Sequence, residues 1–248
     1  PHGQLVIHGR QHVARARHAV FGTFYVKLVS AGGDEYPEAV FDLHQIGVEL
    51  AEQGAHIAFT YVSDSSADKA AALEQKLQGM GVKAKAWKSN AGDAAQCESF
   101  VNEVLQEFGQ VDVLVNNAGA IPSGRLQDIS IQRWQEAWSL KVFGYIHLCQ
   151  LYLPAMEARK AGAVVNIIGM AGRSPKAGYI CGGAGNASLI AFTQALGAAT
   201  QANGVKVVGI NPAVTKTDRM ITQARVNAKL KFGDEERWAE TITGLPFN

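Results

Sequence analysis

Val111-Asp112-Val113-Leu114-Val115-Asn116-Asn117-Ala118-Gly119 is the stretch that decides the fold of this chain of 248 residues. An apolar run that ends in Asn-Asn-Ala-Gly is typical of a buried strand whose tip faces a ligand. Small residues at such a tip let the backbone and a ligand approach closely. Residues 111–115 are therefore predicted to be the fourth strand of a nucleotide-binding α/β sheet.

Helices and strands alternate on both sides of this strand. The other strands are expected at residues 24–30, 56–62, 82–87, 163–168 and 205–210. Helices are expected at residues 46–52, 67–78, 97–108, 130–157 and 179–201. This alternation predicts right-handed βαβ crossovers and a parallel sheet covered on both faces. The fold class is α/β: a doubly wound, Rossmann-like parallel sheet in a single domain, with any ligand outside the carboxyl ends of the strands.

Both ends of the chain depart from this plan. Residues 1–23 are weakly patterned and are expected to form a disordered or basic extension, so the domain is predicted to span residues 24–248. About a dozen residues separate the first expected strand from the helix at Ile46, where a tight glycine turn would be ordinary. No further helix and strand are visible at the carboxyl end.

Composition excludes several classes of protein. The formal net charge is +1, which provides no general attraction to nucleic acid or anionic lipid. The three cysteines have neither metal-ligand spacing nor the pattern of a disulfide framework, so a reducing, cytoplasmic location without a bound metal is expected. No apolar run reaches the ~18 residues of a membrane span.

From about Ile46 to Phe247 the sequence resembles the short-chain dehydrogenase/reductase family. The matching elements are Asn116–Gly119, the strand Val164–Ile168, Tyr179 at the start of a helix, and Asn211-Pro212 followed by Thr217. The resemblance implies an oxidoreductase that transfers a hydride between NAD(P) and a small carbonyl or alcohol substrate. It also implies a homodimer or homotetramer.

The glycine turn that binds the cofactor phosphates in this family is altered. Gly47 matches its last glycine, while Phe41 and Gln45 stand at the other two positions. Alternatively, Ser30-Ala31-Gly32-Gly33 begins the motif and an insertion follows it. Two interpretations stay open: a remodelled loop that uses the dipole of the helix near Ile46, or a degraded site that binds cofactor poorly.

The resemblance assigns the remaining cofactor contacts to loops after the strands. The expected cofactor-binding residues are Ile46, Gly47, Tyr61, Asn90, Asn117, Ala118, Gly119, Pro212, Val214 and Thr217. Tyr61 stands where NAD-preferring members carry an acidic residue, which favours NADP over NAD, although no arginine is present for a 2′-phosphate. The Asn90 amide is expected to face adenine.

Family chemistry uses a tyrosine, a lysine four residues later, a serine and an asparagine. In this chain Tyr179 matches the tyrosine, whereas Gly183, Gly169 and Lys141 occupy the other three positions. The glycines around residue 183 predict either close packing or a weak helix start.

Lys141 is the substitution with a chemical consequence. A tyrosine with its ordinary pKa near 10 is a poor base at neutral pH. A cation at ~4 Å would contribute about 4 kcal/mol at an effective dielectric of about 20, or roughly three pKa units. We hypothesise that Lys141 replaces the missing lysine; the alternative is a solvated surface lysine.

Two functions from different classes follow. The first is an NAD(P)-dependent oxidoreductase with Tyr179 as acid/base and Lys141 beside it. The second is a catalytically silent relative that binds a nucleotide or a protein partner, which the loss of the lysine, serine and glycines favours.

Overall fold

The computed structural model describes residues 18–21, 43–212, 221, 224–225, 228–229 and 231–242. Several predictions concern residues outside these ranges: the strand at 24–30, the alternative turn at 30–33, Phe41, and the contacts of Val214 and Thr217. Thr217 and Val214 therefore stay predictions of the sequence alone.

The described residues form a six-stranded parallel sheet with the strand order β3-β2-β1-β4-β5-β6. The strands are β1 His18–Phe21, β2 His56–Tyr61, β3 Ala84–Lys88, β4 Val113–Asn116, β5 Gly162–Ile167 and β6 Val205–Ile210. This order reverses between β1 and β4, as in doubly wound dinucleotide-binding folds. The predicted fold class is confirmed.

The first strand is not where the sequence pattern placed it. His18–Phe21 pairs in parallel with both β2 and β4 and fills the centre of the sheet. The prediction that the domain begins at residue 24 misplaced this strand, because four residues are too short to show a periodic pattern of their own.

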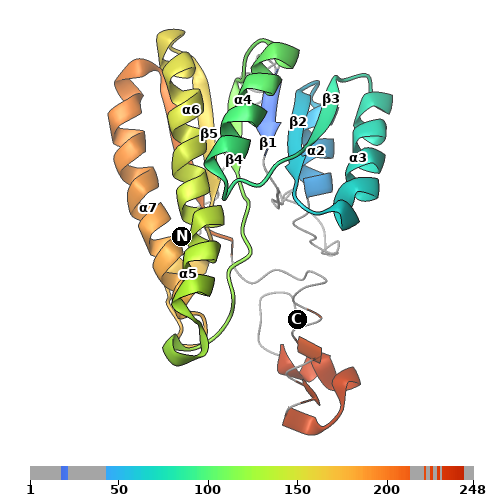
Figure 1. The fold of residues 1–248 in the computed structure, drawn as a ribbon, viewed down its shortest axis with the longest axis vertical. Helices are drawn as coiled ribbons and strands as arrows, with labels where there is room; N and C mark the ends of the chain where they lie inside the picture. The colour runs from blue at the N-terminus through green and yellow to red at the C-terminus, as the bar shows by residue number, and fades with distance from the viewer. Residues whose placement is uncertain are drawn as a thin grey trace, which may run out of the picture.

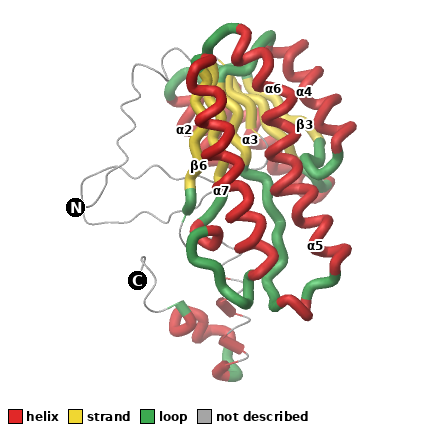
Figure 2. Tube along the Cα trace, turned by 90° about the vertical axis from the view of Figure 1, so that its left-hand side faces the viewer, coloured by secondary structure: helices red, strands yellow, loops and turns green. Residues whose placement is uncertain are grey.

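Helices cover both faces of the sheet (Figures 1 and 2). They are α2 Leu43–Glu52, α3 Ala67–Gly79, α4 Ala94–Phe108, α5 Ile131–Trp138, α6 Gly144–Ala158 and α7 Ile180–Thr200. Side chains of α4 and α6, such as Phe100 and Met156, pack on one face with Leu114 and Val164. Side chains of α2 and α3 pack on the other face. The strands are apolar on both sides because both sides are buried.

Capping side chains explain where two helices begin. The Asp93 carboxylate accepts a hydrogen bond from the Gln96 N–H, so α4 starts three residues before the expected Cys97. The Ser130 hydroxyl does the same for the Arg133 N–H at the start of α5.

The long helix expected over residues 130–157 is interrupted. Between α5 and α6 lies a short π-helix, η3, at Ser139–Phe143. At Gly144 the chain approaches the loop after β3 so closely that a Cβ would lie 2.6 Å from the Ala91 carbonyl oxygen. π-helical turns inside α-helices often mark functional positions, and Lys141 lies in this one.

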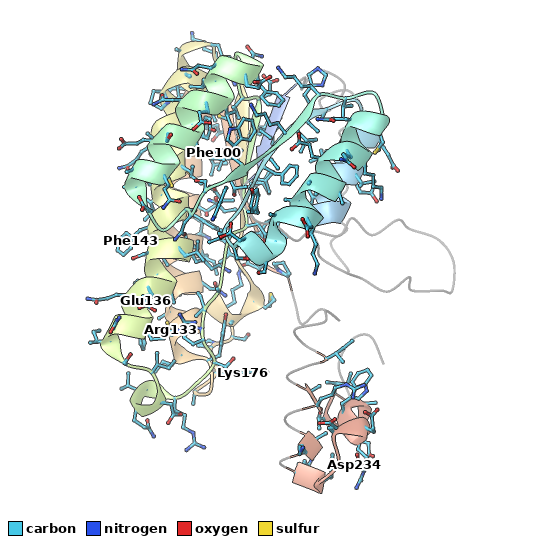
Figure 3. All side chains as sticks on the ribbon, turned by 45° about the vertical axis from the view of Figure 1, so that its right-hand side comes forward. Phe100, Arg133, Glu136, Phe143, Lys176 and Asp234 are labelled. Carbon is cyan, nitrogen blue, oxygen red and sulfur yellow. The ribbon has the colours of Figure 1, made fainter. Side chains whose placement is uncertain are left out.

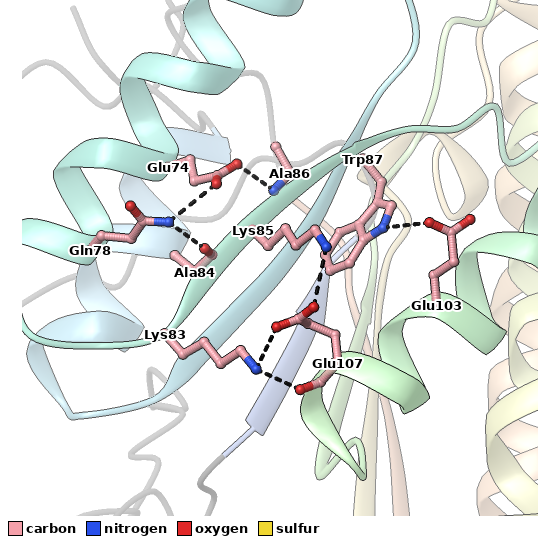
Figure 4. A network of polar contacts seen from close by, with 9 residues as sticks. All are labelled: Glu74, Gln78, Lys83, Ala84, Lys85, Ala86, Trp87, Glu103 and Glu107. Carbon is pink, nitrogen blue, oxygen red and sulfur yellow. Dashed lines mark hydrogen bonds and ion pairs between the residues drawn. The ribbon is translucent and has the colours of Figure 1, made fainter.

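Strand β3 is one edge of the sheet, and α3 covers its free backbone groups (Figure 4). The Glu74 carboxylate accepts the Ala86 N–H at 2.8 Å, and the Gln78 amide donates to the Ala84 carbonyl at 2.9 Å. Two backbone groups of this edge that could pair with another chain are thereby occupied. Among the described helices, none is long and apolar enough to cross a membrane.

Candidate active site at the carboxyl ends of the strands

The Asn116–Gly119 stretch leaves β4 at the carboxyl edge of the sheet. Asn116, Asn117 and Ala118 are buried, whereas Gly119 is exposed. The Asn116 amide donates to the Asn166 side-chain oxygen at 3.0 Å, and Asn166 donates to the Thr193 hydroxyl at 2.9 Å. The first asparagine therefore joins β4 to β5 and α7, and the residues after it carry the chain to the open edge.

Two side chains from the helix before β5 hold the carboxyl end of that strand. The Lys141 ammonium donates to the Ile168 carbonyl oxygen at 2.7 Å, and the Tyr145 hydroxyl donates to the Ile167 carbonyl oxygen at 3.0 Å. Burial raises the pKa of the Tyr145 phenol well above its ordinary value. Tyr145 is therefore a structural donor at this edge.

Lys141 is half-buried and lies against Gly119. A Cβ at residue 119 would be 3.1 Å from the Lys141 Cδ, so the glycine makes room for the lysine stem. Glycine at the end of β4 and lysine in the π-helix thus form one side of the candidate site. The lysine is not a fully solvated side chain.

Tyr179 lies at the amino end of α7, which begins at Ile180. Its ring covers Gly182: a Cβ at residue 182 would be 2.1 Å from the ring carbons and 2.6 Å from the phenol oxygen. The ring also contacts the apolar cluster of Ile121, Ile129, Ala137 and Cys181 with Trp134 and Trp138. The absence of a side chain at 182 is what lets the phenol lie there.

The other glycines in this part of α7 are also packing positions. A Cβ at Gly183 would be 3.3 Å from Pro175 Cβ, and one at Gly185 would be 3.3 Å from both the Trp138 indole nitrogen and Val142 Cγ2. The indole N–H itself donates to the Cys181 carbonyl at 3.2 Å. Close packing explains the glycines, and α7 runs unbroken through them to Thr200.

Ile46 and Gly47 lie inside α2 instead of at its start. The helix begins at Leu43, three residues before the predicted start. Ile46 is buried in the core between α2 and the sheet, and a Cβ at Gly47 would make ordinary contact with Leu77 at 3.5 Å. Residues 22–42 lie outside the described ranges, so Phe41 and the alternative turn that begins at Ser30 stay predictions.

The remaining predicted contacts lie after β2, β3 and β6. Tyr61 is the last residue of β2 and is half-buried. The Asn90 side-chain oxygen accepts the Gly92 N–H at 2.9 Å and so orders the loop after β3. The Pro212 carbonyl accepts the Met170 N–H at 3.0 Å, which ties the end of β6 to the loop after β5.

The cysteines offer no alternative nucleophile. Burial raises the pKa of the Cys97 thiol to about 11 and that of Cys149 to about 12. Neither thiol is ionised at neutral pH. No group of metal-ligating side chains occurs in the part of the chain that the structure describes.

Sequence reasoning missed Asn186. This residue lies in α7, is 3% exposed, and places its amide nitrogen 3.5 Å from the Gly169 carbonyl oxygen. The available signal was an asparagine inside a helix rich in glycine and alanine, since asparagine is a poor residue for a helix interior.

The fold and these strand ends define the class of dinucleotide-binding α/β proteins. Residues 44–227 match the model of the short chain dehydrogenase family. The chain belongs to this family and is an NAD(P)-dependent oxidoreductase that transfers a hydride.

Two proteins are similar to this chain over most of its length. The 3-oxoacyl-(acyl-carrier-protein) reductase FabG of Staphylococcus epidermidis is 30% identical over 214 residues, which cover 81% of this chain and 84% of that protein. A blue fluorescent protein from a metagenomic library, solved with NADPH, is 29% identical with a TM-score of 0.66 and covers 81% of this chain and 76% of its own.

A more distant structure has the same fold. The L-sorbose reductase of Gluconobacter frateurii, solved with NADPH and L-sorbose, has a TM-score of 0.75 at 22% identity. The match covers 92% of this chain and 80% of that one.

Proposed function

We propose that Tyr179 and Lys141 carry the acid–base chemistry of this oxidoreductase. Three contacts and two pairs of chain neighbours link the two residues around the end of β5. The Tyr179 ring rests on Gly182, Asn186 follows one helical turn later beside Gly169, and the carbonyl of the preceding residue, Ile168, binds Lys141. This continuous arrangement at the carboxyl edge of the sheet is the observation that supports the proposal.

The residues at this edge fit a nicotinamide dinucleotide. Three buried side-chain atoms there have no hydrogen-bond partner within the described chain: Asn117 Nδ2, Asn186 Oδ1 and Asn211 Oδ1. One donor and two acceptors of this kind suit the amide and hydroxyl groups of such a ligand. The exposed Gly119 leaves room for close approach of a ligand to the backbone.

Six of the residues expected from the sequence are proposed to hold the cofactor. Asn117, Ala118, Gly119 and Pro212 would line its nicotinamide half, and Tyr61 and Asn90 its adenosine half. The similar proteins whose structures were solved with NADPH favour NADP as the cofactor. The tyrosine at position 61 also favours NADP, because NAD-preferring members of the family carry an acidic residue there. When bound, the nicotinamide supplies or accepts the hydride.

The chain's own contribution is a proton and a charge. In carbonyl reduction the Tyr179 hydroxyl would donate its proton to the substrate oxygen, and in alcohol oxidation the phenolate would accept it. The Lys141 ammonium would stabilise that phenolate by charge attraction. The attraction is stronger than in water because the site is partly buried. The Ile168 carbonyl keeps the ammonium at this edge.

Substrate, assembly and location are each proposed on a separate ground. The substrate is a small carbonyl or alcohol, and the similarity to FabG makes a 3-oxoacyl thioester the first compound to test. A cytoplasmic location is proposed because the three cysteines are free. A homodimer or homotetramer is proposed, supported by two exposed apolar residues, Ile131 (73%) and Phe143 (59%). Figure 3 shows Phe143 pointing outward beside α5, near Arg133 and Glu136.

Kinetics of two variants test the proposed chemistry. We expect Tyr179→Phe to lower kcat by about 100-fold or more while NADPH affinity stays within about threefold, because only proton transfer is removed. We expect Lys141→Met, which retains the stem against Gly119, to move the pH–rate profile of alcohol oxidation to higher pH.

Lys176→Met, at an exposed lysine before α7, is the matched control. Unchanged kcat in Tyr179→Phe would refute the role of the tyrosine. An unmoved pH profile in Lys141→Met would refute the lysine alone. Failure of the wild-type protein to bind either NADPH or NADH would favour the catalytically silent alternative.

A further inference from the structure

Strand β5 extends beyond its neighbour β4 at the carboxyl edge of the sheet. The last pair in register between the two strands is Asn116 with Asn166. β4 ends at that pair, whereas β5 continues to Ile167, which is buried. The end of β5 therefore needs hydrogen-bond partners other than the β4 backbone, because a buried carbonyl without a partner is costly.

Side chains of the preceding helix take the place of β4 at this strand end. The Tyr145 hydroxyl donates to the Ile167 carbonyl oxygen at 3.0 Å, and the Lys141 ammonium donates to the Ile168 carbonyl oxygen at 2.7 Å. Residues four apart lie on one side of a helix, so the two donors reach adjacent carbonyls from consecutive turns. On the other side of the strand, the Ile168 N–H donates to the Ile210 carbonyl on β6 at 2.8 Å.

Tyr145 is a donor with a fixed position. Its side chain is 1% exposed and packs in an apolar cluster with Ala118, Val142, Ile168 and Leu189. Burial raises the pKa of the phenol well above its ordinary value, so the hydroxyl keeps its proton. The proton is therefore available to the Ile167 carbonyl at every pH at which the protein would work.

A second buried tyrosine on α6 differs from Tyr145 in this contact alone. Tyr152 lies about two helical turns later and is 2% exposed. Its hydroxyl has no hydrogen-bond partner among the residues that the structure describes. The two tyrosines share a helix and a buried environment, so a comparison of their variants isolates the effect of the contact with Ile167.

We propose that Tyr145 is a positioning residue for the Lys141 ammonium. By holding the Ile167 carbonyl, Tyr145 fixes the path of the next residue, whose carbonyl binds Lys141. The place of the ammonium relative to the Tyr179 phenol then depends on the Tyr145 hydroxyl. This inference rests on the proposed function, because Lys141 affects the reaction only if it acts on Tyr179.

The reactivity of Lys141 in the ligand-free protein tests the positioning without any catalysis. Tyr145→Phe removes the hydroxyl and keeps the ring. We expect Lys141 to react about threefold faster with an acetylating reagent in this variant, because its ammonium is held less firmly. Mass spectrometry measures the rate, with the exposed Lys176 in the same digest as reference. Tyr152→Phe is the matched control and should leave the rate at the wild-type value.

The pH–rate profile of alcohol oxidation is the second readout. An ammonium that moves from ~4 to ~5 Å from the phenol, at an effective dielectric of about 20, raises the midpoint of the profile by roughly half a pH unit. We expect this rise in Tyr145→Phe, with unchanged affinity for NADPH. Adding Tyr145→Phe to Lys141→Met should cause no further rise, because the two substitutions act through one ammonium group.

Other titratable groups near the phenol do not produce such a shift. The Cys181 thiol lies in the apolar cluster that the Tyr179 ring contacts, and the charge of Arg133 acts on it. Burial raises the pKa of this thiol above its ordinary value. Arg133 stays charged and pairs with Glu136 at 3.2 Å. Neither the thiol nor the arginine changes its charge near neutral pH.

The outcomes separate this inference from the proposed function. Wild-type Lys141 reactivity and an unmoved profile in Tyr145→Phe, beside a moved profile in Lys141→Met, would overturn the inference alone. A further rise in the double variant would overturn it too. An unmoved profile in Lys141→Met would refute the role of the lysine in the proposed function, and the acetylation rate would still decide whether Tyr145 positions it. Tyr145→Met replaces the phenylalanine variant if circular dichroism shows that the latter does not fold.

Discussion

Asn166 is the residue through which three elements are joined beneath the candidate site. It is fully buried, accepts from Asn116 on β4 and donates to Thr193 on α7, and the Thr193 hydroxyl donates onward to the Leu189 carbonyl at 2.7 Å. Hydrogen bonds in such a buried series reinforce one another. The positions of Asn117 and Asn186 both depend on it, because one follows β4 and the other lies in α7.

Replacing Asn166 by alanine should destabilise the fold by about 2–3 kcal/mol. The substitution leaves a cavity and removes the partners of two buried groups. Urea unfolding of the ligand-free protein measures this loss. Asn203→Ala is the control, since Asn203 is exposed and bonds only to Glu157, and it should cost less than about 0.5 kcal/mol. Equal losses of unfolding free energy in the two variants would show that the buried hydrogen bonds of Asn166 stabilise the fold no more than the exposed one of Asn203.

At the scale of elements, the two helices that border the site have different irregularities. The π-helix η3 places Lys141 against the end of β5, and the glycine-rich start of α7 accommodates the Tyr179 ring and Trp138. Each irregularity costs some helical stability. Both occur where side chains converge on the carboxyl ends of the strands.

The edge strand β3 gives a prediction at the same scale. In the double variant Glu74→Ala with Gln78→Ala, the Ala86 N–H and Ala84 carbonyl lose their side-chain partners. We expect a loss of about 1–2 kcal/mol in unfolding free energy and faster aggregation on warming, because the strand edge becomes available for pairing. Chemical unfolding and light scattering measure the two effects.

Gln75→Ala, on the exposed side of the same helix, is the control for this double variant. An aggregation rate equal to that of the control would mean that α3 does not protect the edge.

For the whole molecule, a charge cluster connects the β3 end of the sheet to α4. Hydrogen bonds from the ammonium groups of Lys83 and then Lys85 lower the pKa of the Glu107 carboxyl. Because the pKa in the folded state lies below the unfolded value of about 4.3, this contribution is present above that pH and is lost as pH falls through the folded pKa.

Glu107→Gln should therefore lower the thermal unfolding midpoint at pH 7 and have progressively less effect as pH falls below about 4.3. Melting curves of both proteins from pH 7 to pH 3 check this convergence. Glu52→Gln, at an exposed glutamate on α2, is the control. A difference between wild type and Glu107→Gln that is the same at every pH would contradict an electrostatic origin.

The sequence determined the doubly wound fold and the place of the site within it. Apolar strands, helices of crossover length and the Asn116–Gly119 turn are local signals, and the parallel sheet follows from them because crossovers have one hand. The strands β2 to β6 were predicted to within about two residues for this reason. The central strand at His18–Phe21 was misplaced, since only its pairing with β2 and β4 identifies it.

Only the tertiary structure decided how individual side chains are used at the site. Whether Lys141 contacts solvent or the Ile168 carbonyl, and whether Gly182 weakens a helix or supports the Tyr179 ring, depends on groups far apart in the chain. Asn186 was overlooked for the same reason, because its burial and the carbonyl that orients it come from packing of α7 on the loop after β5. Periodicity reports the environment of an element, whereas the partner of a side chain is set by the three-dimensional contacts of that element.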